Sequence, residues 1–169
     1  MYHSAVHAIG KRSKSPIMAS EIQAHYKNRD PSKRICARAL CIRGDEVLVI
    51  KRHKYGEDYI VLPGGGIDPR ETDFEAATRE LFEETSILAS PISLVHTMPG
   101  TKDHSKQRIV LCEYISGEPI LDPNSEESQR TDNGHNRYIP LWVDVGFAFK
   151  NLVPVELRKL LEDYIADSK

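Results

Sequence analysis

The chain has 169 residues, of which 40% are hydrophobic and 28% are charged, and its formal net charge is −2. This length and composition are typical of one globular domain and exclude a mostly disordered chain, which has fewer apolar residues and more net charge. No apolar run reaches the roughly 18 residues of a membrane-spanning helix, and the N-terminus lacks the apolar core of a secretion signal, so we expect a cytoplasmic protein without a membrane segment.

The three cysteines argue against both a disulfide framework and a zinc site. Cys36, Cys41 and Cys112 cannot all pair with one another, and each lies in an apolar stretch that is typical of a strand. We expect all three to behave as small hydrophobic residues.

The first 34 residues carry an excess of lysine and arginine over their two acidic residues, Glu21 and Asp30. Such a segment could attract phosphate or nucleic acid. Because no interleaved aromatic residues or binding fold accompany the charge, a solvated extension is the better interpretation. We therefore predict a weakly ordered extension over residues 1–34, with a short helix over 20–28, and a folded domain over residues 35–169.

The predicted domain begins with a β-hairpin and a third strand. Residues 35–42 and 46–52 are rich in aliphatic side chains and are separated by Arg43-Gly44-Asp45, which indicates two paired strands. Residues 59–62 predict a short strand that runs into Pro63 and three glycines. We expect an irregular backbone loop there, because glycine and proline disfavour regular elements.

Residues 73–85 predict the central helix of the domain. Thr72 and Glu75 have the spacing of a capping box, in which each side chain satisfies the free backbone amide of the other residue. The apolar positions that would pack this helix against a sheet are Ala76, Ala77, Leu81 and Ile87.

The rest of the chain predicts further strands over residues 92–98, 108–115 and 137–145, with a long polar loop over 122–134. Pro154 stands at the first turn of a closing amphipathic helix whose apolar positions are Leu157, Leu160, Leu161 and Ile165. We therefore predict an α+β fold with a mixed β-sheet sandwiched between α-helices.

Three glutamates on the central helix predict a metal site. Glu83 and Glu84 follow Glu80 by three and four residues, so the three carboxylates project from one side of the helix and repel one another. A divalent cation relieves this repulsion, and Mg²⁺, or Mn²⁺ in its place, prefers carboxylate and carbonyl oxygens. The glycines at 64–66 allow backbone groups to approach the same ion and its phosphates.

A plainer interpretation of the carboxylates is the charged outer face of a surface helix. Taken alone, the glutamates favour that interpretation, because glutamate is a good helix former and common on surfaces. The adjacent glycines and the spacing favour the metal site instead. We also expect Arg79 to pair with Glu71 and so tie the loop to the helix.

The spacing of these residues resembles the Nudix box. Five residues separate Gly65 from Glu71, seven more lead to Arg79-Glu80-Leu81, and Phe82 precedes Glu83-Glu84-Thr85-Ser86-Ile87. The family pattern is Gly, five residues, Glu, seven residues, Arg-Glu, an aliphatic, any residue, Glu-Glu, any residue, Gly and an aliphatic. Ser86 alone departs from it, at a position where glycine normally closes the helix in a left-handed conformation. A serine there costs about 1 kcal/mol and threatens local stability more than metal binding.

The resemblance implies a Nudix fold and hydrolysis of a nucleoside diphosphate linked to another group. By position, the residues that resemble metal ligands are Glu80, Glu83, Glu84 and the carbonyl of Gly64. The residues that resemble catalytic groups are Glu83, Glu80 and Arg79, with Glu71 as the partner of Arg79. Family members often add a glutamate from a remote loop, for which Glu126 and Glu127 are candidates and Glu127 is chosen here. Ordinary solvation of the loop explains these two residues equally well.

Substrate contacts are assigned to Arg52 and to the backbone of Gly65 and Gly66. Other residues near predicted strand ends could also reach a phosphate or a base, although each is individually more typical of a protein surface. These are His53, Lys54, Tyr55, Lys106 and Arg108.

Three functions are consistent with these features. The first is a magnesium-dependent hydrolase of a nucleoside triphosphate, a dinucleoside polyphosphate, an ADP-ribose-like compound or a nucleotide sugar. The second is a non-catalytic nucleotide-binding or sensor module on the same fold, which the intact carboxylates argue against. An isomerase ranks last, because no paired catalytic cysteine and glutamate can be placed. Many relatives are dimers, so a homodimer is one possible assembly, but no interface is identifiable.

Overall fold

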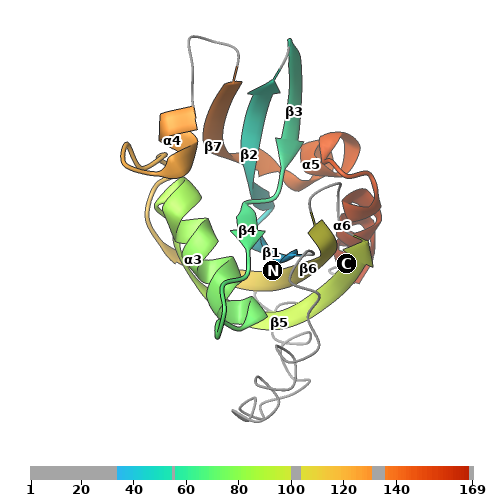
Figure 1. Cartoon of the computed structure of the whole chain (residues 1–169). Coiled ribbons are helices and arrows are strands. Elements are labelled where there is room, and N and C mark those ends of the chain that lie inside the picture. Colours follow the sequence, from blue (N-terminus) through green and yellow to red (C-terminus); the bar gives the residue numbers. More distant parts are fainter. Residues whose placement is uncertain (1–33, 55, 100–103, 131–135, 168–169) are drawn as a thin grey trace.

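A mixed β-sheet forms the centre of the molecule (Figure 1). The computed structural model describes residues 34–54, 56–99, 104–130 and 136–167. The strands within these ranges are β1 Arg34–Arg43, β2 Glu46–Lys54, β3 Glu57–Val61, β4 Gly64–Gly66, β5 Leu88–Pro99, β6 His104–Ser116 and β7 Asn136–Asp144. The helices are α3 Asp73–Thr85, α4 Glu126–Arg130, α5 Val145–Asn151 and α6 Glu156–Asp167.

Strand β1 is the centre of the sheet, whose main order is β3-β2-β1-β6-β5. It forms the predicted hairpin with β2, in which Arg43 pairs with Glu46, and it runs parallel to β6. The short strand β4 pairs with β1, and β7 pairs with β2. The predicted mixed sheet is therefore confirmed, with the glycine segment held directly against its central strand.

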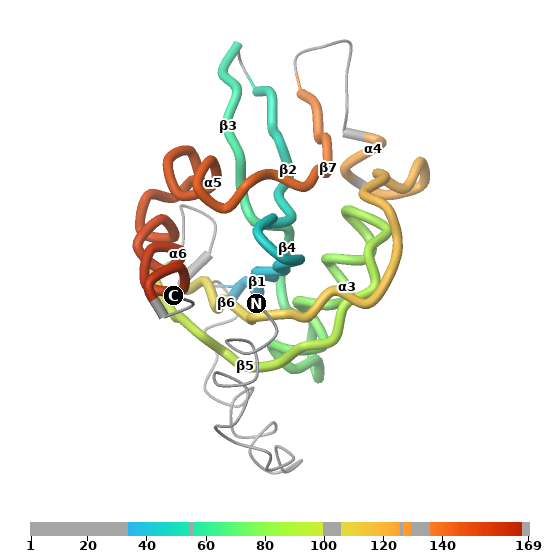
Figure 2. Tube along the Cα trace, turned by 180° about the vertical axis from the view of Figure 1, so that it is seen from behind, coloured from blue at the N-terminus to red at the C-terminus, as the bar shows by residue number. Residues whose placement is uncertain are grey.

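Helices cover both faces of the sheet, with α3 on one side and α5 and α6 on the other (Figures 1 and 2). Two buried clusters result, because side chains alternate between the two faces along each strand. Val47 and Val49 lie in the cluster that contains α5 and α6, whereas Leu48 lies in the cluster that contains α3. The predicted α+β architecture, a sheet sandwiched between helices, is confirmed.

Helix α3 has the bounds that the sequence predicts, and both of its ends are capped. Thr72 and Glu75 form the predicted capping box. Ser86 ends the helix in the left-handed conformation with φ 59°, and its backbone N–H donates to the carbonyl of Phe82. The Ser86 hydroxyl also donates to the carbonyl of Ile120 at 2.8 Å. The serine therefore adopts the conformation expected of the family's glycine and ties the helix end to the segment after β6.

Several predicted boundaries are wrong. The irregular loop predicted over residues 64–66 is instead the strand β4. Strand β5 begins at Leu88 rather than at residue 92, because a register shift accommodates Pro91. The last predicted strand ends at Asp144, whose carboxylate caps α5 by accepting from the N–H of Phe147 at 3.1 Å. The polar loop contains the short helix α4.

The predicted cysteine environment is confirmed. All three cysteines are free and buried in strands. Within the described ranges, none of the helices has both the length and the apolar character that a bilayer crossing requires. The short helix predicted over 20–28, and the extension apart from Arg34, lie outside the described residues.

Candidate functional site

The glycines of β4 leave room that charged side chains of α3 and β1 occupy. A Cβ atom on Gly65 would lie 2.6 Å from the carboxylate atoms of Glu80, and one on Gly66 would lie 2.6 Å from the guanidinium of Arg34. Gly64 has φ +141°, a conformation that other residues rarely adopt. Glycine is thus required at β4 so that ionic groups can lie directly against its backbone.

Glu84 is the most enclosed carboxylate of the site. It is 8% exposed, and one of its oxygens accepts the backbone N–H of Gly64 at 2.7 Å. Burial raises the pKa of Glu84 to about 8, although the Gly64 hydrogen bond and the nearby Arg38 act in the opposite direction. The charges of Glu127 and Glu80 raise this pKa further.

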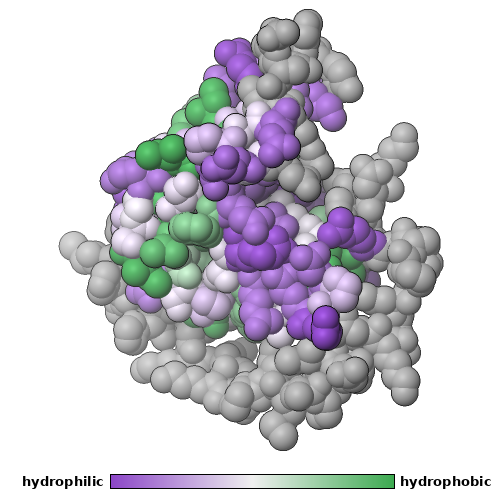
Figure 3. Space-filling model, turned by 60° about the vertical axis from the view of Figure 1, so that its left-hand side comes forward, coloured by the Kyte–Doolittle hydropathy of each residue, from purple (hydrophilic) through white to green (hydrophobic). Residues whose placement is uncertain are grey.

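Glu80 also faces β4, whereas Glu83 lies at the open rim. The Glu80 side chain is 16% exposed and that of Glu83 is 51% exposed. Burial raises the pKa of Glu80, Arg79 lowers it, and the charges of Glu83 and Glu127 raise it. Figure 3 brings the α3 side of the molecule forward, and the middle of this face is largely hydrophilic. The acids of α3 therefore form an inner pair and an outer member.

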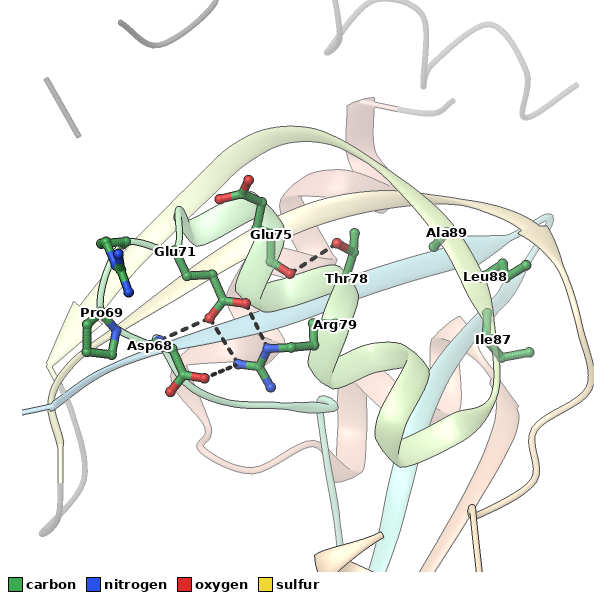
Figure 4. A pocket seen from close by; sticks show the side chains of 10 residues that line it. Asp68, Pro69, Glu71, Glu75, Thr78, Arg79, Ile87, Leu88 and Ala89 are labelled. Carbon is green, nitrogen blue, oxygen red and sulfur yellow. Dashed lines mark hydrogen bonds and ion pairs between the residues drawn. The ribbon is translucent and has the colours of Figure 1, made fainter. Parts of the chain in front are cut away.

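Arg79 organises the network beside the inner acids, as the sequence predicts for its pairing with Glu71. Its Nε and Nη2 donate to the two Glu71 oxygens at 2.7 and 3.0 Å, and the side chains point toward one another in Figure 4. Its Nη1 donates to Glu80 at 2.9 Å and to Glu83 at 3.2 Å. Its Nη2 also donates to the carbonyl of Gly66 at 3.3 Å. One guanidinium thus fixes the loop, the strand and two of the three helix glutamates.

The Arg79–Glu71 pair borders a hollow of about 660 Å³ on the flank of α3 (Figure 4). Its lining includes Asp68 and Glu75 as well as the pair, but none of the three helix glutamates. Burial raises the pKa of Glu71, but hydrogen bonds from Arg79 and from the backbone of Asp68 outweigh it, so the net pKa is lowered. On this flank the charges of Arg79 and Glu71 offset each other, in contrast to the charges of the acids that face β4.

Arg38 is a site residue that the sequence interpretation missed. Its Nη1 donates to the carbonyl of Gly64 at 2.6 Å and to that of Leu62 at 3.3 Å. The Gly64 carbonyl, which was expected to bind metal, therefore already accepts from a guanidinium, although a carbonyl oxygen has a second lone pair. The sequence does contain an indication of this role, because Arg38 is a charged residue within an otherwise apolar run of a central strand.

The charge of Glu127, one of the two candidate loop glutamates, acts on the inner acids, since it raises the pKa of both Glu80 and Glu84. The side chain of Glu126 lies outside the described part of the structure. Helix α4 therefore brings one remote carboxylate toward the site.

The other predicted contacts are dispersed. Arg52 lies on the α3 face of β2, and His53 lies on the opposite face, where its ring nitrogen is 2.7 Å from Asp58. Arg108 is 2.7 Å from Asp73 at the start of α3. Lys54 and Lys106 are exposed, and Tyr55 lies outside the described residues.

The donor set fits a hard divalent cation by its chemistry. Two acids with raised pKa values face a bare glycine backbone, and Mg²⁺ typically binds through one or two carboxylates, water and substrate phosphates. In the described residues, no group of three or more His, Cys, Asp or Glu side chains could hold an ion by itself. An open site completed by water and phosphate matches this arrangement better than a closed protein cage.

The mixed sheet between helices and the glutamate helix packed on a glycine strand define a NUDIX domain. The NUDIX family model matches residues 32–161, and the chain belongs to this family. Among curated relatives, it is similar to the NAD-capped RNA hydrolase NudC of Edwardsiella ictaluri, with 27% identity over 73% of this chain and 44% of that protein. It is also similar to diphosphoinositol polyphosphate phosphohydrolase 3-beta of Bos taurus, with 44% identity over 44% of this chain and 46% of that protein.

The solved structures agree on the fold. A MutT protein from Methanosarcina mazei Go1 superimposes with a TM-score of 0.59 and 20% identity over 84% of this chain and 99% of that chain. A NUDIX hydrolase from Nitrosomonas europaea gives a TM-score of 0.61 and 13% identity over 80% of this chain and 73% of that chain. The chain spans less than half the length of each of the two curated relatives named above.

Proposed function

We propose that this chain is a magnesium-dependent hydrolase that cleaves the diphosphate linkage of a nucleoside diphosphate joined to another group. The observation that carries the proposal is the pair of inner acids, Glu80 and Glu84, which face the glycine backbone of β4 and whose pKa values are both raised by burial. The names of the two curated relatives, hydrolases of NAD-capped RNA and of diphosphoinositol polyphosphates, support cleavage of phosphoric anhydride bonds.

Mg²⁺, with Mn²⁺ as a substitute, would be held by Glu80, Glu83, Glu84 and the carbonyl of Gly64, with water and substrate phosphates completing its coordination. When bound, such an ion polarises phosphoryl oxygens and lowers the pKa of the attacking water. The chain itself holds the carboxylates in position. The Gly64 N–H fixes the Glu84 carboxylate, and Arg79 fixes Glu80 and Glu83.

The remaining site residues receive roles that follow from their positions. Glu83, at the open rim, and Glu127, on α4, are the proposed bases for the attacking water. Gly65 and Gly66 have no side chains, so phosphate oxygens can approach the backbone of β4. Arg52 is proposed to contact the substrate.

The test is a screen of nucleotide diphosphates for released phosphate or monophosphate, with Mg²⁺, with Mn²⁺ and with a chelator. Metal-dependent turnover of at least one compound is expected, and Glu84→Gln should abolish most of it. Glu162→Gln, an exposed glutamate of α6, is the matched control and should retain full turnover. Binding without turnover would instead identify a non-catalytic sensor module. The absence of both binding and turnover would refute the assignment.

Three further proposals rest on the sequence alone: a cytoplasmic location, a homodimer and a weakly ordered basic extension over residues 1–34. Light scattering tests the dimer, and limited proteolysis tests the extension. A monomer mass would overturn the homodimer, and resistance of the first 34 residues to protease would overturn the weakly ordered extension.

A further inference from the structure

Three side chains form a row across neighbouring strands on the α3 face of the sheet. Arg52 of β2 pairs in register with Tyr59 of β3 on one side and with Tyr138 of β7 on the other. The guanidinium carbon lies 3.7 Å from the ring centroid of Tyr138 and 6.0 Å from that of Tyr59. A flat cation therefore lies between two aromatic rings, and we call this set the Tyr59–Arg52–Tyr138 row.

The row lies on the same face as the acids of α3, beyond the part of the sheet that α3 covers. Side chains alternate along β2, so Arg52 shares the face of Leu48, which packs in the α3 cluster. The strands β2, β3 and β7 extend side by side past α3 (Figure 1). Gly64 follows Tyr59 by five positions in the chain, so their backbones are at most about 17 Å apart. An extended nucleoside diphosphate is of comparable length.

The contacts of Arg52 leave it incompletely satisfied. Its Nη2 donates to the side-chain oxygen of Asn136 at 3.3 Å, but its Nε is buried and has no hydrogen-bond acceptor in the described part of the chain. Buried donors in folded proteins are nearly always paired, and an exception requires an explanation. The tyrosine rings and the Asn136 side chain hold the guanidinium in place but do not pair its Nε.

A second arginine on the same face provides an internal comparison. Arg43 also lies over aromatic rings, 4.2 Å from the ring of Trp142 and 5.3 Å from that of Tyr114. However, its guanidinium donates to the Glu46 carboxylate at 2.8 Å, so its charge is neutralised within the fold. No such carboxylate partner of Arg52 occurs among the described residues. The two clusters share residue types, but Arg43 is a completed structural unit and Arg52 is not.

We propose that the Tyr59–Arg52–Tyr138 row binds the nucleobase of the substrate. This inference rests on the proposed function and names the substrate class of the same site. Bases stack on tyrosine rings and on arginine guanidinium planes, and their carbonyl and ring nitrogen atoms accept hydrogen bonds from arginine. A polyol phosphate presents no flat π-face to such a row. The row therefore selects nucleotide diphosphates over diphosphoinositol polyphosphates.

The test compares a nucleotide substrate, ADP-ribose or another active compound of the screen, with two base-free diphosphates, phosphoribosyl diphosphate and a diphosphoinositol polyphosphate. The wild type should favour the nucleotide. Tyr138→Leu should raise the KM for the nucleotide at least tenfold with little change in kcat, and should alter turnover of the base-free compounds less than twofold. Arg52→Lys keeps the positive charge but loses the planar guanidinium, so its turnover of the nucleotide should be impaired as much as that of Arg52→Gln.

The matched control is Arg137→Gln, because Arg137 is exposed and adjacent to Tyr138 but faces the other side of β7. Rescue by Arg52→Lys, an equal loss on all three compounds in Tyr138→Leu, or a wild-type preference for the inositol compound would overturn the inference. Binding of the non-hydrolysable α,β-methylene ADP, measured by calorimetry, separates the two proposals. A tenfold weaker affinity in Tyr138→Leu supports the row even if turnover is absent, and an unchanged affinity refutes it.

Discussion

The two charged regions beside α3 use the same residue types in opposite ways. On the flank, Glu71 lies against Arg79, which lowers the pKa of the glutamate. Facing β4, Glu84 is buried and Glu80 is partly buried near other acids, and the pKa values of both are raised. The flank is built for stability, whereas the inner acids retain a repulsion that a cation can relieve. Variants should therefore separate the two regions.

The largest expected effect is on activity at the inner region. Glu84→Gln should reduce kcat/KM by on the order of 10²- to 10³-fold, because a preorganised electrostatic contact is lost. The folded protein should persist, since glutamine can still accept the Gly64 N–H. Steady-state kinetics and circular dichroism check both statements. An active variant, or an unfolded one, would contradict the division between the regions.

The next effect is expected in the stability that the flank contributes. Arg79→Met leaves Glu71 without its bidentate partner and should lower the free energy of unfolding by about 2–3 kcal/mol, a value discounted for the partial exposure of the arginine. Lys159→Met is the control, because its exposed pair with Asp163 should contribute less than about 1 kcal/mol. Urea unfolding measures both, and equal losses would show that the flank has no special role.

The pH dependence of stability should distinguish the regions within one protein. Because the folded pKa of Glu84 is about 8, the metal-free folded state binds its proton more tightly than the unfolded state. Stability should therefore fall as pH rises from about 5 to 8, by at most about 1.4 kcal/mol per unit. Glu71 has a lowered folded pKa, so its contribution is present at neutral pH and is lost as pH falls below the unfolded value of about 4.5.

Glu84→Gln should remove most of the fall in stability between pH 5 and pH 8, because Glu80, whose pKa is also raised, remains. The loss of stability at acid pH should stay, and added Mg²⁺ should flatten the interval from pH 5 to pH 8 in the wild type. Thermal unfolding across pH in chelator measures this. If the stability of the metal-free wild type instead rises from pH 5 to pH 8, burial does not raise the pKa of Glu84.

The smallest expected effect concerns the helix end that both regions share. Ser86→Ala should lower the free energy of unfolding by about 1 kcal/mol, because the hydrogen bond to Ile120 is lost while the left-handed strain remains. Ser86→Gly should be nearly neutral, since the relief of strain offsets the same loss. Activity should be unchanged in both. Greater stability of the alanine variant would show that the hydroxyl does not stabilise this end.

Local patterns in the sequence predicted the helix and its ion pair well. The bounds of α3, its capping box and the Arg79–Glu71 pair follow from spacing within one short segment. The chain order and spacing of the strands also sufficed for the mixed sheet. These features depend on interactions between residues that are near in sequence or share a strong hydrophobic pattern.

Features set by tertiary pairing could not be predicted in the same way. Residues 64–66 contain only glycine, and they form β4 because β1 supplies hydrogen-bond partners from a distant part of the chain. Helix α5 is short and apolar, so its start was indistinguishable from the end of β7. Arg38 could be noticed in the sequence, but its contact with Gly64 required the β1–β4 pairing.

The most direct test of the account is the affinity of the metal-free protein for Mn²⁺, measured by calorimetry in the wild type, Glu84→Gln and Glu162→Gln. The account predicts that Glu84→Gln weakens binding at least tenfold, whereas Glu162→Gln, on a helix across the sheet, leaves it unchanged. Wild-type affinity in Glu84→Gln would show that the acids facing β4 do not form the cation site.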